Sequence, residues 1–210
     1  MTETSGSRAA PPRAAARPAF YLAPHPATPC EAVRSIAVEV ERRADGALEL
    51  IYTIEADPDR IRLPEPAAPR RTDGLWRHTC CEAFIAMEKG ASTLDRAEGS
   101  RPDGSLAGHY LELNFSPSGE WAAYAFDGYR SGMRPLEPMA APLITVERDA
   151  SGGAWSLRAT VPAGSLAGTR ARLALAAVIE DSEGELAYWA LRHPPGRPDF
   201  HHPGGFAAEL

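Results

Sequence analysis

Polar side chains interrupt apolar, β-like stretches at three places in the sequence. Glu82 lies within an apolar run, Glu112 and Asn114 alternate with leucines, and Arg130 follows a Gly-Tyr pair. Alternation alone would allow Glu112 and Asn114 to face solvent. In the alternative interpretation, Glu82, Asn114 and Arg130 surround the rim of one concave face. There a carboxylate, an amide and a guanidinium would hydrogen-bond the hydroxyl groups of a small ligand.

The tryptophans are the second group that could bind a ligand. Trp76 stands at the entrance to a β-like run, and Trp189 follows Tyr188 in another. Each could be a core residue, or a flat apolar platform on which a sugar ring stacks. Trp121 and Trp155 lie in the middle of hairpins, where packing against neighbouring strands is the expected role.

A Pro-, Gly- and His-rich segment ends the chain. Its metal-ligating residue types are His193, Asp199, His201 and His202. Such residues can bind zinc or another transition metal, but adjacent histidines cannot easily share one ion, so no metal is expected. The preferred interpretation is a segment that packs back over the sheet, anchored by Phe200 and Phe206.

The β-like runs that must position these residues are predicted to form antiparallel hairpins. Turn residues separate pairs of alternating runs, and Asp45-Gly46 is the strongest of these signals. The predicted hairpins cover Val33–Ala56, Tyr110–Phe126, Leu143–Val161 and Arg172–Leu191, with a buried strand at His78–Met87. Leu173–Ile179 is short and apolar and is predicted as a central strand, although Ala and Leu also suit a helix. About ten strands predict an all-β, antiparallel β-sandwich of jelly-roll or immunoglobulin-like type.

Length and composition fit one domain. The chain has 210 residues, 44% of them hydrophobic, and a formal net charge of −6. We expect residues 1–19 to be a disordered tail and residues 20–210 to form the single domain. The acidic balance argues against a nucleic-acid partner, and no apolar run is long enough to span a membrane.

The cysteines and the N-terminal residues predict a cytoplasmic protein. Three cysteines are too few for a disulfide framework, and residues 1–17 contain no apolar signal-peptide core. Standard hydrolase, kinase and nucleotide-binding motifs are missing, which lowers the prospect of an enzyme.

Several short motifs together resemble a known family. They are Trp76 with the strand Cys80–Ile85, the run Tyr110–Gly119, Trp121–Tyr124, Tyr188–Leu191 and Pro198–His201. Over roughly Phe20–Leu210 the chain resembles DOMON-like domains, which are related to family 9 carbohydrate-binding modules. The resemblance implies a β-sandwich in which two tryptophans clamp a saccharide. Trp76 and Trp189 match those positions best, and Glu82 matches an acidic residue that follows the first.

The leading hypothesis is therefore a non-catalytic module that binds a saccharide or a sugar-containing metabolite. Its expected site residues are Trp76, Trp189, Glu82, Arg130 and Asn114. A haem or redox module is one alternative, with Met87, Met133 and His193 available as ligands, but no spacing supports haem or calcium and no cofactor is expected. Two others remain: an enzyme using Glu82 or Glu112, and an interaction domain without a small ligand. No protein partner is assigned.

Overall fold

The computed structural model describes residues 19–87, 109–150, 152–164 and 170–210, which form an antiparallel, all-β fold. Most of the expected N-terminal tail lies outside these residues. The strands are β1 (Ala19–Pro24), β2 (Val33–Arg42), β3 (Leu48–Ala56), β4 (Ile61–Arg62), β5 (Cys80–Met87), β6 (Tyr110–Phe115), β7 (Trp121–Phe126), β8 (Arg134–Pro135), β9 (Leu143–Arg148), β10 (Ala154–Val161), β11 (Ala171–Asp181), β12 (Leu186–Ala190) and β13 (Ala208–Glu209). Two 3-10 turns, η1 (Leu75–Arg77) and η2 (Pro203–Gly205), are the helical elements of the described ranges, and neither is long and apolar enough to cross a membrane.

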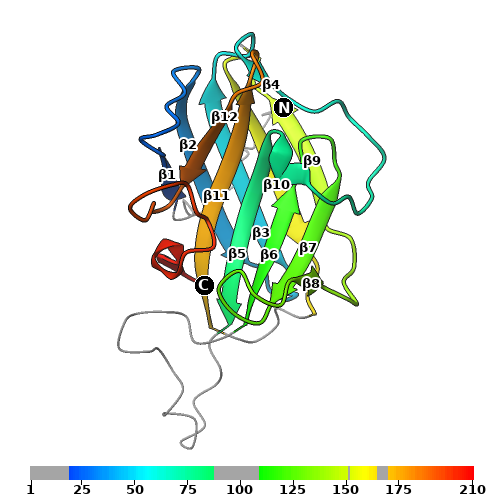
Figure 1. Cartoon of the computed structure of the whole chain (residues 1–210). Coiled ribbons are helices and arrows are strands. Elements are labelled where there is room, and N and C mark those ends of the chain that lie inside the picture. The colour runs from blue at the N-terminus through cyan, green and yellow to red at the C-terminus, as the bar shows by residue number, and fades with distance from the viewer. Residues whose placement is uncertain (1–18, 88–108, 151, 165–169) are drawn as a thin grey trace, which may run out of the picture.

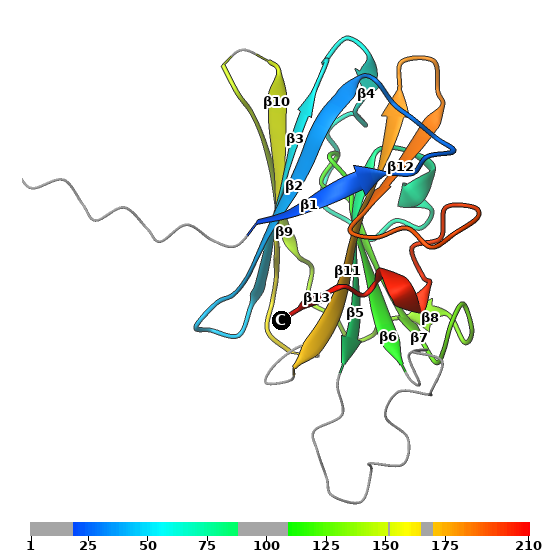
Figure 2. The same ribbon diagram turned by 90° about the vertical axis from the view of Figure 1, so that its left-hand side faces the viewer.

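The strands form two layers (Figures 1 and 2). Sheet A has the order β1-β2-β3-β10-β9, and sheet B has the order β12-β11-β5-β6-β7-β8, with β4 and β13 also paired to β11. β1 connects the layers, because it pairs with β2 along most of its length and with β12 at its end. The predicted antiparallel β-rich class is confirmed, and of the thirteen strands in the described ranges three are only two residues long.

All four predicted hairpins are present as antiparallel neighbours: β2–β3, β6–β7, β9–β10 and β11–β12. The β2–β3 turn shows why its sequence signal is strong. Gly46 has φ of 83°, a conformation that costs glycine little, and the Asp45 carboxylate accepts a hydrogen bond from the Ala47 N–H at 3.0 Å. The helical alternative for Leu173–Ile179 is wrong, because this run lies in β11 between β5 and β12.

The main hydrophobic core lies between the two sheets. Alternate residues of sheet B, including Cys81, Leu113 and Leu175, pack against Leu50 and Tyr52 of sheet A in one buried cluster. This apolar burial is the principal favourable contribution to folding.

The outer face of sheet B is buried as well. Figure 2 shows η1 and the segment between β12 and β13 on the side of this sheet that is turned away from sheet A. Cys80, Phe84, Tyr110 and Phe206 belong to a second buried cluster there. Cys80 and Cys81 therefore face opposite sides of β5, as strand alternation predicts. Both are free thiols, as is Cys30.

Tyr52 links the two layers by a polar contact. Its hydroxyl donates a 2.8 Å hydrogen bond to the backbone carbonyl of Glu82 on β5, and the side chain is fully buried. A residue of sheet A thereby fixes the strand segment that carries Glu82.

We expect Tyr52→Phe to lower the free energy of unfolding by about 0.5–1.5 kcal/mol, because the variant keeps the ring and loses one buried hydrogen bond. Urea denaturation of the wild type and the variant measures this. Tyr21→Phe is the matched control, since the Tyr21 side chain is 72% exposed. Equal stabilities of the wild type and Tyr52→Phe would show that this bond contributes nothing.

Candidate functional site

A groove of about 330 Å³ opens on the outer face of sheet B. Its walls include the aromatic side chains of Trp76, Phe126, Tyr188 and Phe200. Its polar lining comes from Glu82, Glu112, Arg130 and His201. An apolar cleft of this size with a few convergent polar groups is the usual form of a small-molecule site.

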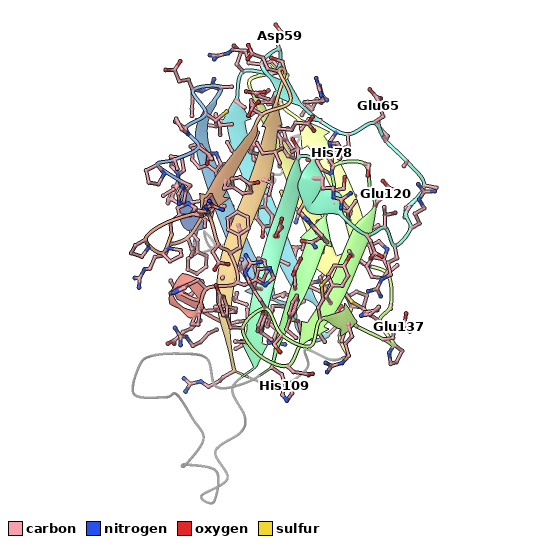
Figure 3. The ribbon with its side chains drawn as sticks, viewed as in Figure 1. Asp59, Glu65, His78, His109, Glu120 and Glu137 are labelled. Carbon is pink, nitrogen blue, oxygen red and sulfur yellow. The ribbon has the colours of Figure 1, made fainter. Side chains whose placement is uncertain are left out.

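Figure 3 gives the extent of the sheet face that carries the groove. In this view β5, β6 and β7 lie toward the viewer, with His78 just before β5 and His109 just before β6 at opposite ends. Side chains crowd the area between these two histidines, whereas the labelled carboxylates of Asp59, Glu65 and Glu137 lie at the margin of the molecule.

Trp76 lies where the sequence analysis expects a ligand platform. It sits in η1, which follows Gly74 with φ of 79°, and its side chain is half-buried against the groove. The edge of its ring meets Tyr124 on β7, with 6.0 Å between ring centroids. The Tyr124 hydroxyl in turn donates a 2.6 Å hydrogen bond to Asp73, so that the segment before η1 is tied to sheet B.

Trp189 does not face the groove, which corrects the expected pairing of two tryptophans on one face. It lies opposite Ala177 of β11 on the inner side of sheet B, is 4% exposed and belongs to the core between the sheets. Strand alternation turns its neighbour Tyr188 toward the groove instead. Trp189 also borders a separate depression beside β1 and β2 that is lined by Tyr21 and Cys30.

Two carboxyl groups form the floor of the groove. Glu82 on β5 lies opposite Asn114 on β6, and Glu112 lies opposite Phe84, so the two acids are diagonal neighbours on one face. Glu82 and Glu112 are only 3% and 4% exposed. Glu112 and Asn114 therefore do not face solvent, because the outer face of this sheet is covered.

Asn114 supports Glu112 without lining the groove. Its Nδ2 donates a 2.8 Å hydrogen bond to Glu112 Oε1. Asn114 Oδ1 and Glu82 Oε1 are buried and have no hydrogen-bond partner among the described residues. Unsatisfied buried oxygens are costly, and they are often found where a ligand or proton completes the network.

Burial raises the pKa of both acids. For Glu82 the neighbouring carboxylate of Glu112 adds to the effect, and its pKa lies well above the ordinary value. For Glu112 burial also dominates, but the hydrogen bond from Asn114 and the charge of Arg130 oppose it. Glu82 is therefore the acid that holds a proton more strongly.

The C-terminal segment contributes His201 to the site. The Tyr110 hydroxyl lies 2.9 Å from His201 Nδ1 and accepts a 3.2 Å hydrogen bond from the backbone N–H of Arg130. The hydroxyl proton is then free to bond Nδ1, and in this arrangement the ring hydrogen is on Nε2, which lies 3.8 Å from Glu112 Oε2. Burial, followed by the charge of Arg130, lowers the pKa of His201 to about 4, so the ring is neutral near pH 7.

Arg130 is held at the groove by Asp199. Its Nη2 and Nε donate hydrogen bonds of 2.7 and 3.2 Å to Asp199 Oδ1, and the Tyr129 hydroxyl donates another to Oδ2. Burial opposes ionisation of Asp199, but these hydrogen bonds outweigh it and lower its pKa. Arg130 has φ of 51°, an uncommon conformation for a residue other than glycine, and such conformations gather at binding sites.

The expected site residues therefore divide into three groups. Trp76, Glu82 and Arg130 line the groove, Asn114 lies beneath it, and Trp189 lies in the core. The sequence analysis did not identify Tyr188 as a groove residue. The alternation of side chains along a strand was the available signal, because it puts Tyr188 and Trp189 on opposite faces of β12. The sequence also gives no sign that His201 lines the groove. It does indicate that the segment containing His201 packs over the sheet.

The remaining histidines of the C-terminal segment have separate partners. His193 Nε2 lies 2.8 Å from the Ala23 carbonyl, and His202 Nδ1 accepts a hydrogen bond from the Gly204 N–H at the start of η2. Within the described ranges no three His, Cys, Asp or Glu side chains are grouped as metal ligands would be. Met133 borders the groove, but His193 does not.

No family model matches the chain, and no curated protein matches it. The solved structures similar to it include two of a family 9 carbohydrate-binding module from Caldicellulosiruptor kristjanssonii. The complex with cellotriose has 11% sequence identity and a TM-score of 0.46, over 82% of this chain and 72% of that chain. The complex with glucose has 13% identity and the same TM-score, over 83% and 74%. The relation to DOMON-like domains stays a prediction.

We expect Trp189→Ala to lower the free energy of unfolding by about 3–5 kcal/mol, because it empties a large volume in the core. Trp76→Ala is expected to cost clearly less, since Trp76 is only half-buried at the groove. Denaturant titrations of both variants measure the difference. Equal losses of stability would show that Trp76 is a core residue and would remove it as a ligand platform.

The raised pKa of Glu82 predicts a stability that depends on pH. Below the ordinary value of 4.5 the carboxyl is protonated in both folded and unfolded chains. As the pH rises, the unfolded carboxyl ionises first, so the free energy of unfolding falls until the folded pKa is passed. We therefore expect Glu82→Gln to gain stability relative to the wild type as the pH rises above about 5.

Urea titrations across this range test the pH prediction. His201 acts in the opposite direction, because its lowered pKa removes stability as the pH falls below 6.5, but its contribution is common to both proteins and cancels in the difference. Parallel pH profiles for wild type and Glu82→Gln would mean that Glu82 ionises normally in the folded protein.

Proposed function

We propose that the groove on the outer face of sheet B binds a saccharide or a sugar-containing metabolite without catalysing a reaction. The observation that carries the proposal is the combination of half-buried aromatic rings with buried hydrogen-bonding groups in one groove. A pyranose is amphipathic in the same way, because its axial C–H surface is apolar and its edge carries hydroxyl groups.

Trp76 and Tyr188 supply the apolar surfaces. Both are half-buried and line the groove, and each is fixed by an edge-on aromatic neighbour, Trp76 by Tyr124 and Tyr188 by Phe200. Rings that are already held in place lose little conformational freedom when a ligand stacks on them. This preorganisation favours binding by a groove of modest size.

Glu82 and Glu112 supply the hydrogen bonds. A protonated carboxyl both donates and accepts, and an ionised one accepts, so the pair can satisfy hydroxyl groups of either orientation. Glu82 Oε1, which has no partner in the described part of the chain, is the atom with most to gain from a ligand. Each such bond replaces one to water and contributes only about 1 kcal/mol, so weak binding of single sugars is expected.

We expect isothermal titration calorimetry with glucose and cellotriose to detect binding by the wild type. Trp76→Ala is expected to weaken it at least about tenfold, equivalent to about 1.4 kcal/mol, because one stacking face is lost. Glu65→Gln is the control, since Glu65 is exposed and distant from the groove. A folded Trp76→Ala that binds both sugars as the wild type does would contradict the proposed site.

Mass spectrometry of cellotriose after incubation with the protein distinguishes binding from catalysis. Buried carboxyl pairs also serve as acid and base in glycoside hydrolysis, and Glu82 has the raised pKa of a general acid. Intact cellotriose in the mass spectrum after incubation supports a binding module. Cleaved cellotriose, with cleavage lost in Glu82→Gln, would replace the proposed function by an enzymatic one.

A further inference from the structure

Among the described residues no cation is hydrogen-bonded to the carboxyl pair at the floor of the groove, although the nearby charge of Arg130 acts on Glu112. Glu82 and Glu112 come from adjacent strands, face the same groove and are more than nine-tenths buried. Glu112 receives one hydrogen bond from a neutral amide, and Glu82 Oε1 receives none within the described ranges. Burial of a carboxylate that has no paired cation favours its protonated form.

The cations near the groove are committed to other acceptors. The Arg130 guanidinium donates two hydrogen bonds to Asp199, whose negative charge balances its own. His201 is neutral near pH 7, and its Nε2 stays 3.8 Å from Glu112. Arg71, behind Tyr124, donates to the backbone carbonyls of Ala123 and Leu136.

The groove therefore offers negative charge and aromatic faces together. Trp76 and Tyr188 line it beside the two acids, and Asp73 accepts the hydroxyl of Tyr124, which packs against Trp76. A cation over an aromatic ring is attracted to the electron-rich face, and an ammonium group next to a carboxylate forms a charge-assisted hydrogen bond. Both interactions are strongest where water is excluded, as it is from Glu82 and Glu112.

We propose that the groove selects sugars that carry a protonated amine, with the amine bound by Glu82 and Glu112. This inference rests on the proposed saccharide function and narrows its ligand class to amino sugars. Binding the ammonium group supplies the missing cation, so the proton held by the carboxyl pair is released to solvent. A neutral sugar can only hydrogen-bond the pair and leaves that proton in place.

The test compares three hexoses that differ at one substituent. Calorimetry near neutral pH with glucosamine, N-acetylglucosamine and glucose separates charge from shape, since acetylation removes the charge of the amine. We expect glucosamine to bind at least about tenfold more tightly than glucose. Repeating the titration in buffers of different ionisation enthalpy is expected to show proton release with glucosamine and none with glucose.

Two variants tie the preference to the carboxyl pair. Glu112→Gln and Glu82→Gln are each expected to reduce the glucosamine-to-glucose affinity ratio toward one, whereas Glu65→Gln is expected to keep it. Thermal melts establish that each variant is folded, and either one alone is sufficient for the comparison. A ratio unchanged in both folded variants would overturn the assignment of the amine to these acids.

The outcomes separate this inference from the proposed function. Equal affinities for the three sugars would overturn the amine preference and leave saccharide binding intact. Binding of none of them, and of no cellotriose either, would overturn the saccharide function. A titration with methylammonium chloride then tests the amine preference. Binding by the wild type that is lost in Glu82→Gln would show a cation site that does not bind sugars. No binding of methylammonium would overturn the amine preference as well as the saccharide function.

Discussion

The burial of two carboxyl groups on the outer face of sheet B is the interaction on which the groove depends. An antiparallel sheet commonly presents one face to the core and the other to solvent. Here the outer face is covered by η1 and by the segment between β12 and β13, so Glu82 and Glu112 are enclosed with aromatic rings. Enclosure accounts for the raised pKa of both acids and for the free energy that a suitable ligand can recover.

The hairpins and the chemistry of most site residues could be predicted from the sequence. Alternation and turn residues such as Asp45-Gly46 act over a few neighbouring positions, so their effect is visible without the fold. Trp76, Glu82 and Arg130, three residues that the sequence singled out, line the groove. Because strand alternation is local, it also specifies that Tyr188 and Trp189 face opposite sides, although it does not specify which of them faces the core.

The covering of sheet B could not be predicted from the sequence. Tyr110 and His201 are 91 positions apart, and their contact depends on how β11 and β12 bring the C-terminal segment across the sheet. Without that information Glu112 and Asn114 fit a solvent-facing row equally well. The expectation that Trp189 faces the groove fails for the same reason. Both faces of sheet B are buried, so the sequence does not show whether Trp189 or Tyr188 points into the core between the sheets.

The segment that covers sheet B also affects the order in which the molecule can assemble. Asp199 and His201 follow β1 to β12 in the sequence, and of the described strands β13 comes after them. During synthesis the wall that completes the groove is therefore made after most of both sheets. Before that wall docks through Tyr110 and Arg130, the carboxyl groups on β5 and β6 are less enclosed, which favours their ionised forms. Proton uptake during folding is therefore expected when the groove closes over these two acids.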